Sequence, residues 1–126
     1  MRHVLFSCLV LLLVLAFCLF SMFHIRAICQ QALTLLSGAQ ESAQRSDFAS
    51  CRRSVDAAMR HWRRYERYFG LMLTHTEVDD ILERFAALTQ YAALEDQDDF
   101  LAGCAELRFS ISHLQEMELP TLENIL

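Results

Sequence analysis

The chain has 126 residues, of which 54% are hydrophobic, and its formal net charge is −5 at pH 7. The residues after the first 23 are enough for one small domain and too few for two. An acidic balance disfavours a nucleic-acid partner, because a basic surface is the minimum requirement for binding phosphates. With only three glycines and one proline, the chain contains few helix breakers, and we expect an all-α fold.

The first expected element is a membrane-spanning helix. Residues 4–23 carry no formal charge and read VLFSCLVLLLVLAFCLFSMF. As a helix, this run is roughly 30 Å long, which matches the hydrocarbon core of a bilayer. A cleaved signal peptide is the alternative, but the run exceeds an ordinary signal-peptide core and no small-x-small cleavage site follows it. We therefore expect a signal anchor that is retained.

The orientation of this span follows from its flanking charges. Arg2 and the terminal amine precede it, and Arg26 is the only fixed positive charge shortly after it. Because positive flanks favour the cytoplasm, this nearly balanced count leans towards a cytoplasmic N-terminus, and we expect a single-pass protein of the cell membrane with the rest of the chain outside.

The residues after the span are unevenly charged and include three cysteines. Residues 24–70 contain eight arginines and four acids, a net of +4, whereas residues 71–126 contain two arginines and twelve acids, a net of −10. Neighbouring helices of opposite charge attract one another, so internal complementarity explains this asymmetry most simply. The three cysteines beyond the span match neither a zinc site nor a disulfide framework, and we expect them to be small buried residues.

Four further helical segments follow from apolar residues spaced at three and four. The first, residues 24–43, continues out of the membrane. Asp47 is the expected N-cap of the second, which runs to Phe69 with Gly70 as the residue that ends it. Thr76 is the expected N-cap of the third, and Asp96 that of the fourth.

Four helices joined by short loops are expected to form an antiparallel four-helix bundle. The expected organisation is an anchor (1–23), a helical bundle (24–119) and a C-terminal tail (120–126), with Pro120 ending the last helix. In such a bundle, the entrance to the third helix and the C-terminal tail both lie beside the membrane.

Several stretches of the sequence are distinctive when taken together. They are Trp62, Tyr65, the run 71–81 (LMLTHTEVDDI), Leu107-Arg108-Phe109, and the ending Leu122-Glu123-Asn124-Ile125-Leu126. Together they resemble an uncharacterised bacterial family, catalogued as domain of unknown function forty-three sixty-three. The resemblance covers nearly the whole chain, and Val78 stands where the family often has isoleucine. It implies a membrane-anchored helical protein with its domain outside the cytoplasm, no assigned activity and no catalytic residues.

The favoured function is that of an interaction or accessory subunit without enzymatic activity or cofactor. The most distinctive residues should meet at the membrane-proximal end, where a partner membrane protein or a second copy could bind. The candidate interaction residues are His75, Glu77, Asp79, Ile81, Glu123, Asn124 and Ile125.

A sensory or ligand-binding bundle is the alternative function. His75, His113 and Glu116 would approach one another at the membrane-proximal end and could hold a metal ion. Capping of the helix by Thr76, with His75 hydrogen-bonded in the loop, explains the same residues without a metal.

The remaining motifs indicate neither nucleic-acid binding nor catalysis. Residues 62–68 interleave arginines and aromatics, but an amphipathic helix with its aromatics in the core produces the same pattern. The sequence contains no nucleophile–histidine–acid order, phosphate loop or HExxH motif, so we expect no enzyme.

Overall fold

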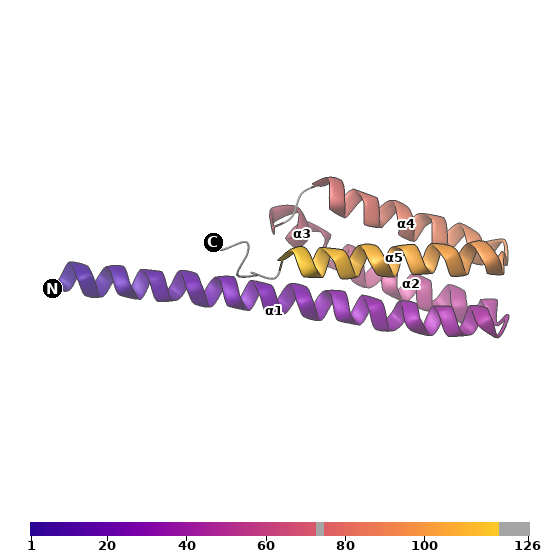
Figure 1. Cartoon of the computed structure of the whole chain (residues 1–126), viewed down its shortest axis with the longest axis horizontal. Coiled ribbons are helices and arrows are strands. Elements are labelled where there is room, and N and C mark those ends of the chain that lie inside the picture. The colour runs from indigo at the N-terminus through magenta and orange to yellow at the C-terminus, as the bar shows by residue number, and fades with distance from the viewer. Residues whose placement is uncertain (73–74, 119–126) are drawn as a thin grey trace.

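Helices make up nearly all of the part of the chain that the computed structural model describes, residues 1–72 and 75–118 (Figure 1). No strand occurs within these two ranges, and the all-α prediction is confirmed. The helices are α1 (Arg2–Gln44), α2 (Phe48–Arg64), α3 (Glu66–Met72), α4 (His75–Ala93) and α5 (Gln97–Glu118).

α1 is one uninterrupted helix of 43 residues, and at 1.5 Å per residue it is roughly 65 Å long. Its first half extends alone beyond the other helices, whereas its second half packs against them (Figure 1). The apolar side chains of the first half remain exposed, from Val4 at 66% to Phe23 at 64%. Among the described residues, α1 is the one helix long and apolar enough to cross a membrane.

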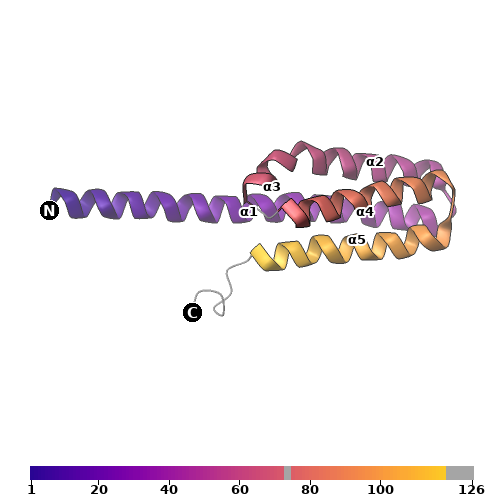
Figure 2. The same cartoon turned by 90° about the horizontal axis from the view of Figure 1, so that it is seen from above.

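The second half of α1 forms an antiparallel four-helix bundle with α2, α4 and α5 (Figure 2). Around the bundle, α1 contacts α2, α2 contacts α4, α4 contacts α5, and α5 contacts α1. We call the end at which α1 leaves the bundle the span end. The opposite end, where α1 connects to α2 and α4 connects to α5, is the turn end.

Small residues on α1 allow its neighbours to pack closely. Cys29, Ala32 and Ala39 are fully buried on one face of α1. The other helices supply most of the large core side chains, which fill the space that these small residues leave. The largest fully buried side chains are Trp62, Phe69, Phe85, Phe100, Leu36, Leu88, Leu107 and Ile111.

Both connections at the turn end have the same construction. Ser46 and Glu95 adopt left-handed backbone angles, with φ of 60° and 56°. The amide of the next residue then bonds the carbonyl five residues earlier, which is the Schellman arrangement of a helix C-terminus: Asp47 bonds Ser42 at 2.8 Å, and Asp96 bonds Tyr91 at 3.0 Å.

The same two aspartates begin the following helices. Asp47 Oδ1 accepts a hydrogen bond from the Ser50 amide at 3.2 Å, and Asp96 Oδ1 accepts one from the Asp99 amide at 3.2 Å. Each carboxylate thereby satisfies an amide that the first helical turn leaves unpaired. One aspartate therefore ends one helix and starts the next, which keeps each connection short.

Two expected helix boundaries are wrong. α2 ends at Arg64, not at Phe69, and Gly70 lies inside α3 without the positive φ of a helix-ending glycine. The break places Phe69 against Trp62, with ring centroids 4.5 Å apart, so packing of the core outweighs continuation of the helix. α4 begins at His75, so Thr76 lies inside the first turn and is not the N-cap.

The expected attraction between the basic and acidic halves is mostly not realised as ion pairs. In the described ranges, only Arg52 and Glu95 form a pair between the halves, at 3.6 Å, and both side chains are largely exposed. Arg84 pairs with two acids of its own half, Asp80 and Glu106, each at 3.0 Å. Exposed pairs of this kind contribute little to stability, so burial of apolar side chains carries the fold.

Two helical glycines provide a test of the packing. An added Cβ at Gly38 meets nothing closer than Ser54 Oγ at 4.0 Å, whereas at Gly103 it meets Leu88 Cδ2 at 3.1 Å. We expect Gly38→Ala to raise the free energy of unfolding by about 0.5–1 kcal/mol, because alanine restricts the unfolded chain. Gly103→Ala should gain less or lose stability, because Leu88 is fully buried and must move.

Thermal unfolding of the full chain in detergent, followed by circular dichroism, checks this ranking. Equal stabilisation by both substitutions would show that the α4–α5 contact is looser than described.

The buried cysteines provide a second test. Burial raises the pKa of the Cys51 and Cys104 thiols from 9.0 to about 11. The thiolate is the reactive form, so both thiols should react with maleimide at least about tenfold more slowly in the folded chain than in denaturant. Because the fold favours the neutral thiols, their contribution to stability is complete below pH 9.0 and is lost as the pH rises through about 11.

Mass spectrometry of a Cys8→Ala, Cys18→Ala chain measures the labelling, with Glu95→Cys as an exposed control. Native labelling of Cys51 or Cys104 at the rate of that control would contradict the described core.

Candidate functional site

Aromatic side chains fix the span end of the bundle against residues 21–24 of α1. The imidazole of His24 lies edge-on to the rings of Tyr65 and Tyr68, with centroids 5.5 and 5.1 Å apart. The Tyr68 hydroxyl donates a hydrogen bond to the Ser21 carbonyl oxygen at 3.5 Å. Since Ser21 belongs to the charge-free run, α3 lies level with the last residues of that run.

A second aromatic layer stands behind these contacts. His61 is buried, and its Nε2–H donates to the Ile28 carbonyl oxygen at 3.1 Å. The fully buried ring of Trp62 stacks on Phe69 and lies 6.2 Å from Phe85. These rings join α1, α2, α3 and α4 at one level. The span end is therefore held by large, rigid side chains.

A shallow groove between α4 and α5 opens at the span end and has a volume of about 110 Å³. Phe109 stands at its edge with 72% of its side chain exposed. Its ring is parallel to that of His113, with centroids 6.0 Å apart. The groove thus combines an exposed aromatic surface with acidic groups. Its lining residues are Glu77, Asp80, Ile81, Phe109, Ser110, His113 and Leu114.

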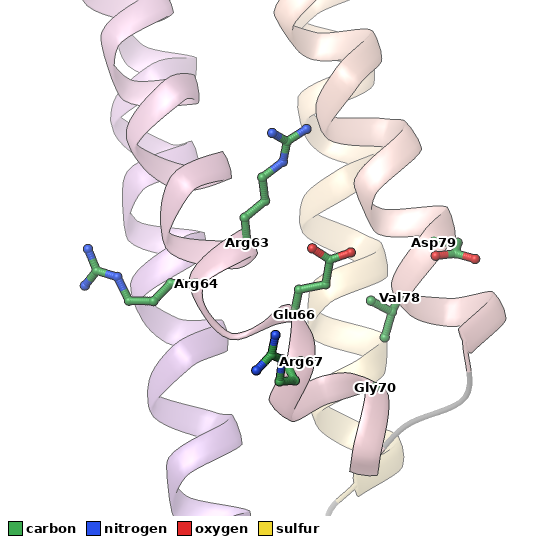
Figure 3. Close-up of a pocket in the computed structure, with 7 residues that line it drawn as sticks. All are labelled: Arg63, Arg64, Glu66, Arg67, Gly70, Val78 and Asp79. Carbon is green, nitrogen blue, oxygen red and sulfur yellow. The ribbon is translucent and has the colours of Figure 1, made fainter.

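A larger, polar cleft of about 880 Å³ lies on another side, between α2–α3 and α4 (Figure 3). Figure 3 shows Arg63 and Glu66 reaching toward the gap between α2 and α4, and Arg64 pointing away from it. Since Arg63, Arg64 and Glu66 are exposed, the cleft is open to solvent. Its lining residues are Arg63, Arg64, Glu66, Arg67, Gly70, Val78 and Asp79.

Comparison with known families identifies the domain. A family model described as Domain of unknown function (DUF4363) matches residues 19–125. The chain belongs to this family. The DUF4363 match begins inside the charge-free run, so the contacts of Ser21 and His24 with α3 fall within the family's domain. No curated protein and no solved structure matches the chain significantly.

Three of the expected interaction residues lie where α4 begins in this DUF4363 protein. Glu77 and Ile81 line the α4–α5 groove, with Ile81 buried, whereas Asp79 faces the polar cleft on the other side. The start of α4 therefore meets the last turns of α5, as the bundle order predicts. The side chain of His75, together with Glu123, Asn124 and Ile125, lies outside the described residues.

Two of the three residues of the alternative metal site, His113 and Glu116, have described side chains. His113 stacks on Phe109 and is exposed, and Glu116 is exposed one turn further along α5. Within residues 1–72 and 75–118, no group of three histidine, cysteine or acidic side chains is placed to hold a metal ion.

Sequence reasoning missed two features of the span end. The helix break at Tyr65, which brings Tyr65 and Tyr68 to His24, has no local signal such as proline or a positive-φ glycine. In the sequence, Phe109 was singled out only as part of the stretch Leu107-Arg108-Phe109, which belongs to the family resemblance. Its position on the polar side of α5, between the buried Leu107 and Ile111, was the signal that could have identified it.

Proposed function

We propose that this DUF4363 protein is a single-pass membrane protein without enzymatic activity, and that the span end of its bundle binds a partner membrane protein. The bundle is proposed to stand outside the cytoplasm, on the basis of the charges that flank the span. The observation that carries the docking proposal is the exposed Phe109 beside the α4–α5 groove.

The exposed run of α1 supports the anchor. An apolar cylinder that no other part of the protein covers is costly in water, and a bilayer is the environment that removes this cost. Retention of the run is supported by the contact between Tyr68 and Ser21. Cleavage after the run would remove Ser21 and leave Tyr68 without its acceptor.

The groove supports a protein partner of particular chemistry. Exposed aromatic side chains at an apolar depression are typical anchors of protein interfaces. Asp80 is already paired with Arg84, but Glu77 makes no ion pair with any described residue. A partner segment with an apolar side chain beside an arginine or lysine would complement both Phe109 and Glu77. Gln30 of α1 donates a hydrogen bond to Gln115 of α5 at 3.2 Å, so the groove lies about two turns or more of α1 beyond the end of the span, within reach of the extramembrane part of a partner that is itself in the membrane.

Site-specific photocrosslinking in intact membranes tests this docking. Phe109 and Leu94 are matched positions, since both are apolar and are 72% and 74% exposed, but Leu94 lies at the turn end. A benzophenone side chain at position 109 should form an adduct with an integral membrane protein, and the same probe at position 94 should not. A charge reversal, Glu77→Lys, should remove most of the adduct, whereas Glu95→Lys at the turn end should leave it unchanged.

Three results would contradict the docking proposal. They are equal adducts from positions 94 and 109, an adduct that is insensitive to Glu77→Lys, and an adduct consisting of two copies of this chain. In the last case a second copy would replace the partner.

A further inference from the structure

We propose that Arg63, Arg64 and Arg67, which we call the arginine cluster, bind the phosphate groups of anionic phospholipids in the leaflet next to the bundle. This inference rests on the anchoring part of the proposed function and adds a lipid partner to it. It concerns the α2–α3 side of the span end and is separate from the α4–α5 groove.

The position of the arginine cluster relative to the end of the span follows from its neighbours in the chain. Arg64 precedes Tyr65, and Arg67 precedes Tyr68. These two tyrosines contact His24 and Ser21, at the end of the charge-free run. If that run fills the hydrocarbon core, the cluster lies within the next layer, which holds the headgroups and is about 5–8 Å thick on each side. Tyrosines are enriched at this same level of membrane proteins.

The cluster is not used within the part of the protein that the structure describes. None of its three guanidinium groups makes an ion pair or a hydrogen bond with any residue that the structure describes. Two other arginines differ in this respect. Arg84 pairs with Asp80 and Glu106, and Arg108 donates to Gln40 at 2.6 Å. Exposed, unpaired arginines at headgroup height are available to phosphate oxygens, which the guanidinium group binds well.

The break between α2 and α3 shapes the cluster. In a continuous helix, Arg60, Arg63, Arg64 and Arg67 would follow one straight stripe. Arg63 and Arg64 end α2 ahead of the break and point about 100° apart as neighbours in a helix, so Arg63 reaches toward the polar cleft while Arg64 points away from it (Figure 3), and Arg67 follows the break in α3. The cluster therefore spreads sideways along the span end. Glu66 and Asp79, which are exposed and line the same cleft as these arginines, reduce the local positive charge without cancelling it.

The charge of the whole chain makes this placement significant. A protein of net charge −5 is repelled by an anionic surface unless a basic region faces that surface. The twelve acids of residues 71–126 would favour a tilt of the bundle away from the bilayer. Contact between the arginine cluster and anionic headgroups would hold the α2–α3 side down, and thereby set the direction in which the α4–α5 groove faces.

Lipid binding to the full chain in detergent tests the inference, with bound lipids counted by native mass spectrometry. Short-chain phosphatidylglycerol and phosphatidylcholine are the two probes, and inorganic phosphate is the competitor. We expect phosphatidylglycerol to bind about tenfold more tightly than phosphatidylcholine, with the difference shrinking as salt is added. The triple variant Arg63→Gln, Arg64→Gln, Arg67→Gln should lose this preference.

A matched triple at the other end controls for net charge. Arg45→Gln, Arg52→Gln, Arg53→Gln removes the same three charges from the half of the bundle nearer the turn end and should keep the preference. The conservative triple Arg63→Lys, Arg64→Lys, Arg67→Lys should keep most of it, which covers the case in which the glutamine variant folds poorly. Emission of Trp62, the chain's single tryptophan, reports whether each variant is folded.

Several outcomes would overturn the inference. They are equal binding of the two lipids, an equal loss in both glutamine triples, and displacement of phosphatidylglycerol by inorganic phosphate, which would indicate a site for a free anion. Flotation with phosphatidylcholine vesicles separates this inference from the anchor. If the chain floats but shows no lipid preference, only the lipid-binding inference is contradicted. If the chain does not float, the membrane anchor is contradicted as well.

Discussion

The structure depends on the continuity of α1. One helix carries an uncovered apolar surface over its first half and a stripe of small buried residues, such as Ala32 and Ala39, over its second. Because the helix is not interrupted between them, the bundle cannot change its position along the span without breaking backbone hydrogen bonds. The contacts of Tyr65 and Tyr68 with His24 then fix which residues of the bundle lie level with the end of the span.

Local patterns were sufficient for most of the fold. Spacing at three and four identifies buried residues such as Val78, Ile81 and Phe85, because each helix must place one face in the core. An aspartate ahead of such a face, as at positions 47 and 96, is a local signal as well. The break at Tyr65 could not be predicted, since residues 48–69 keep one apolar period and the break is decided by contacts with residues some forty positions away. The meeting of the start of α4 with the last turns of α5 followed from the bundle order, whereas the groove between them and the polar cleft depend on side-chain packing and on the break.

The distribution of charge has a different meaning once the fold is known. The sequence suggests that a basic first half neutralises an acidic second half. Among the described residues, one exposed ion pair links the halves, Arg52 with Glu95, near the turn end. The arginines at the span end face outward, and the groove on the far side of the same end carries acids. The span end therefore presents two surfaces of different chemistry, one suited to phosphate groups and one to an apolar and basic partner segment.

The central claim is that residues 4–23 cross the bilayer and that the α2–α3 break lies at its surface. Spin labels at three positions in lipid nanodiscs, with Cys8 and Cys18 replaced, measure it through their accessibility to oxygen and to a water-soluble nickel complex. The account predicts that a label at position 14 is deep in the hydrocarbon, one at position 67 is at headgroup depth, and one at position 95 is in water. A label at position 67 as accessible to the nickel complex as that at position 95, or a label at position 14 in water, would contradict it.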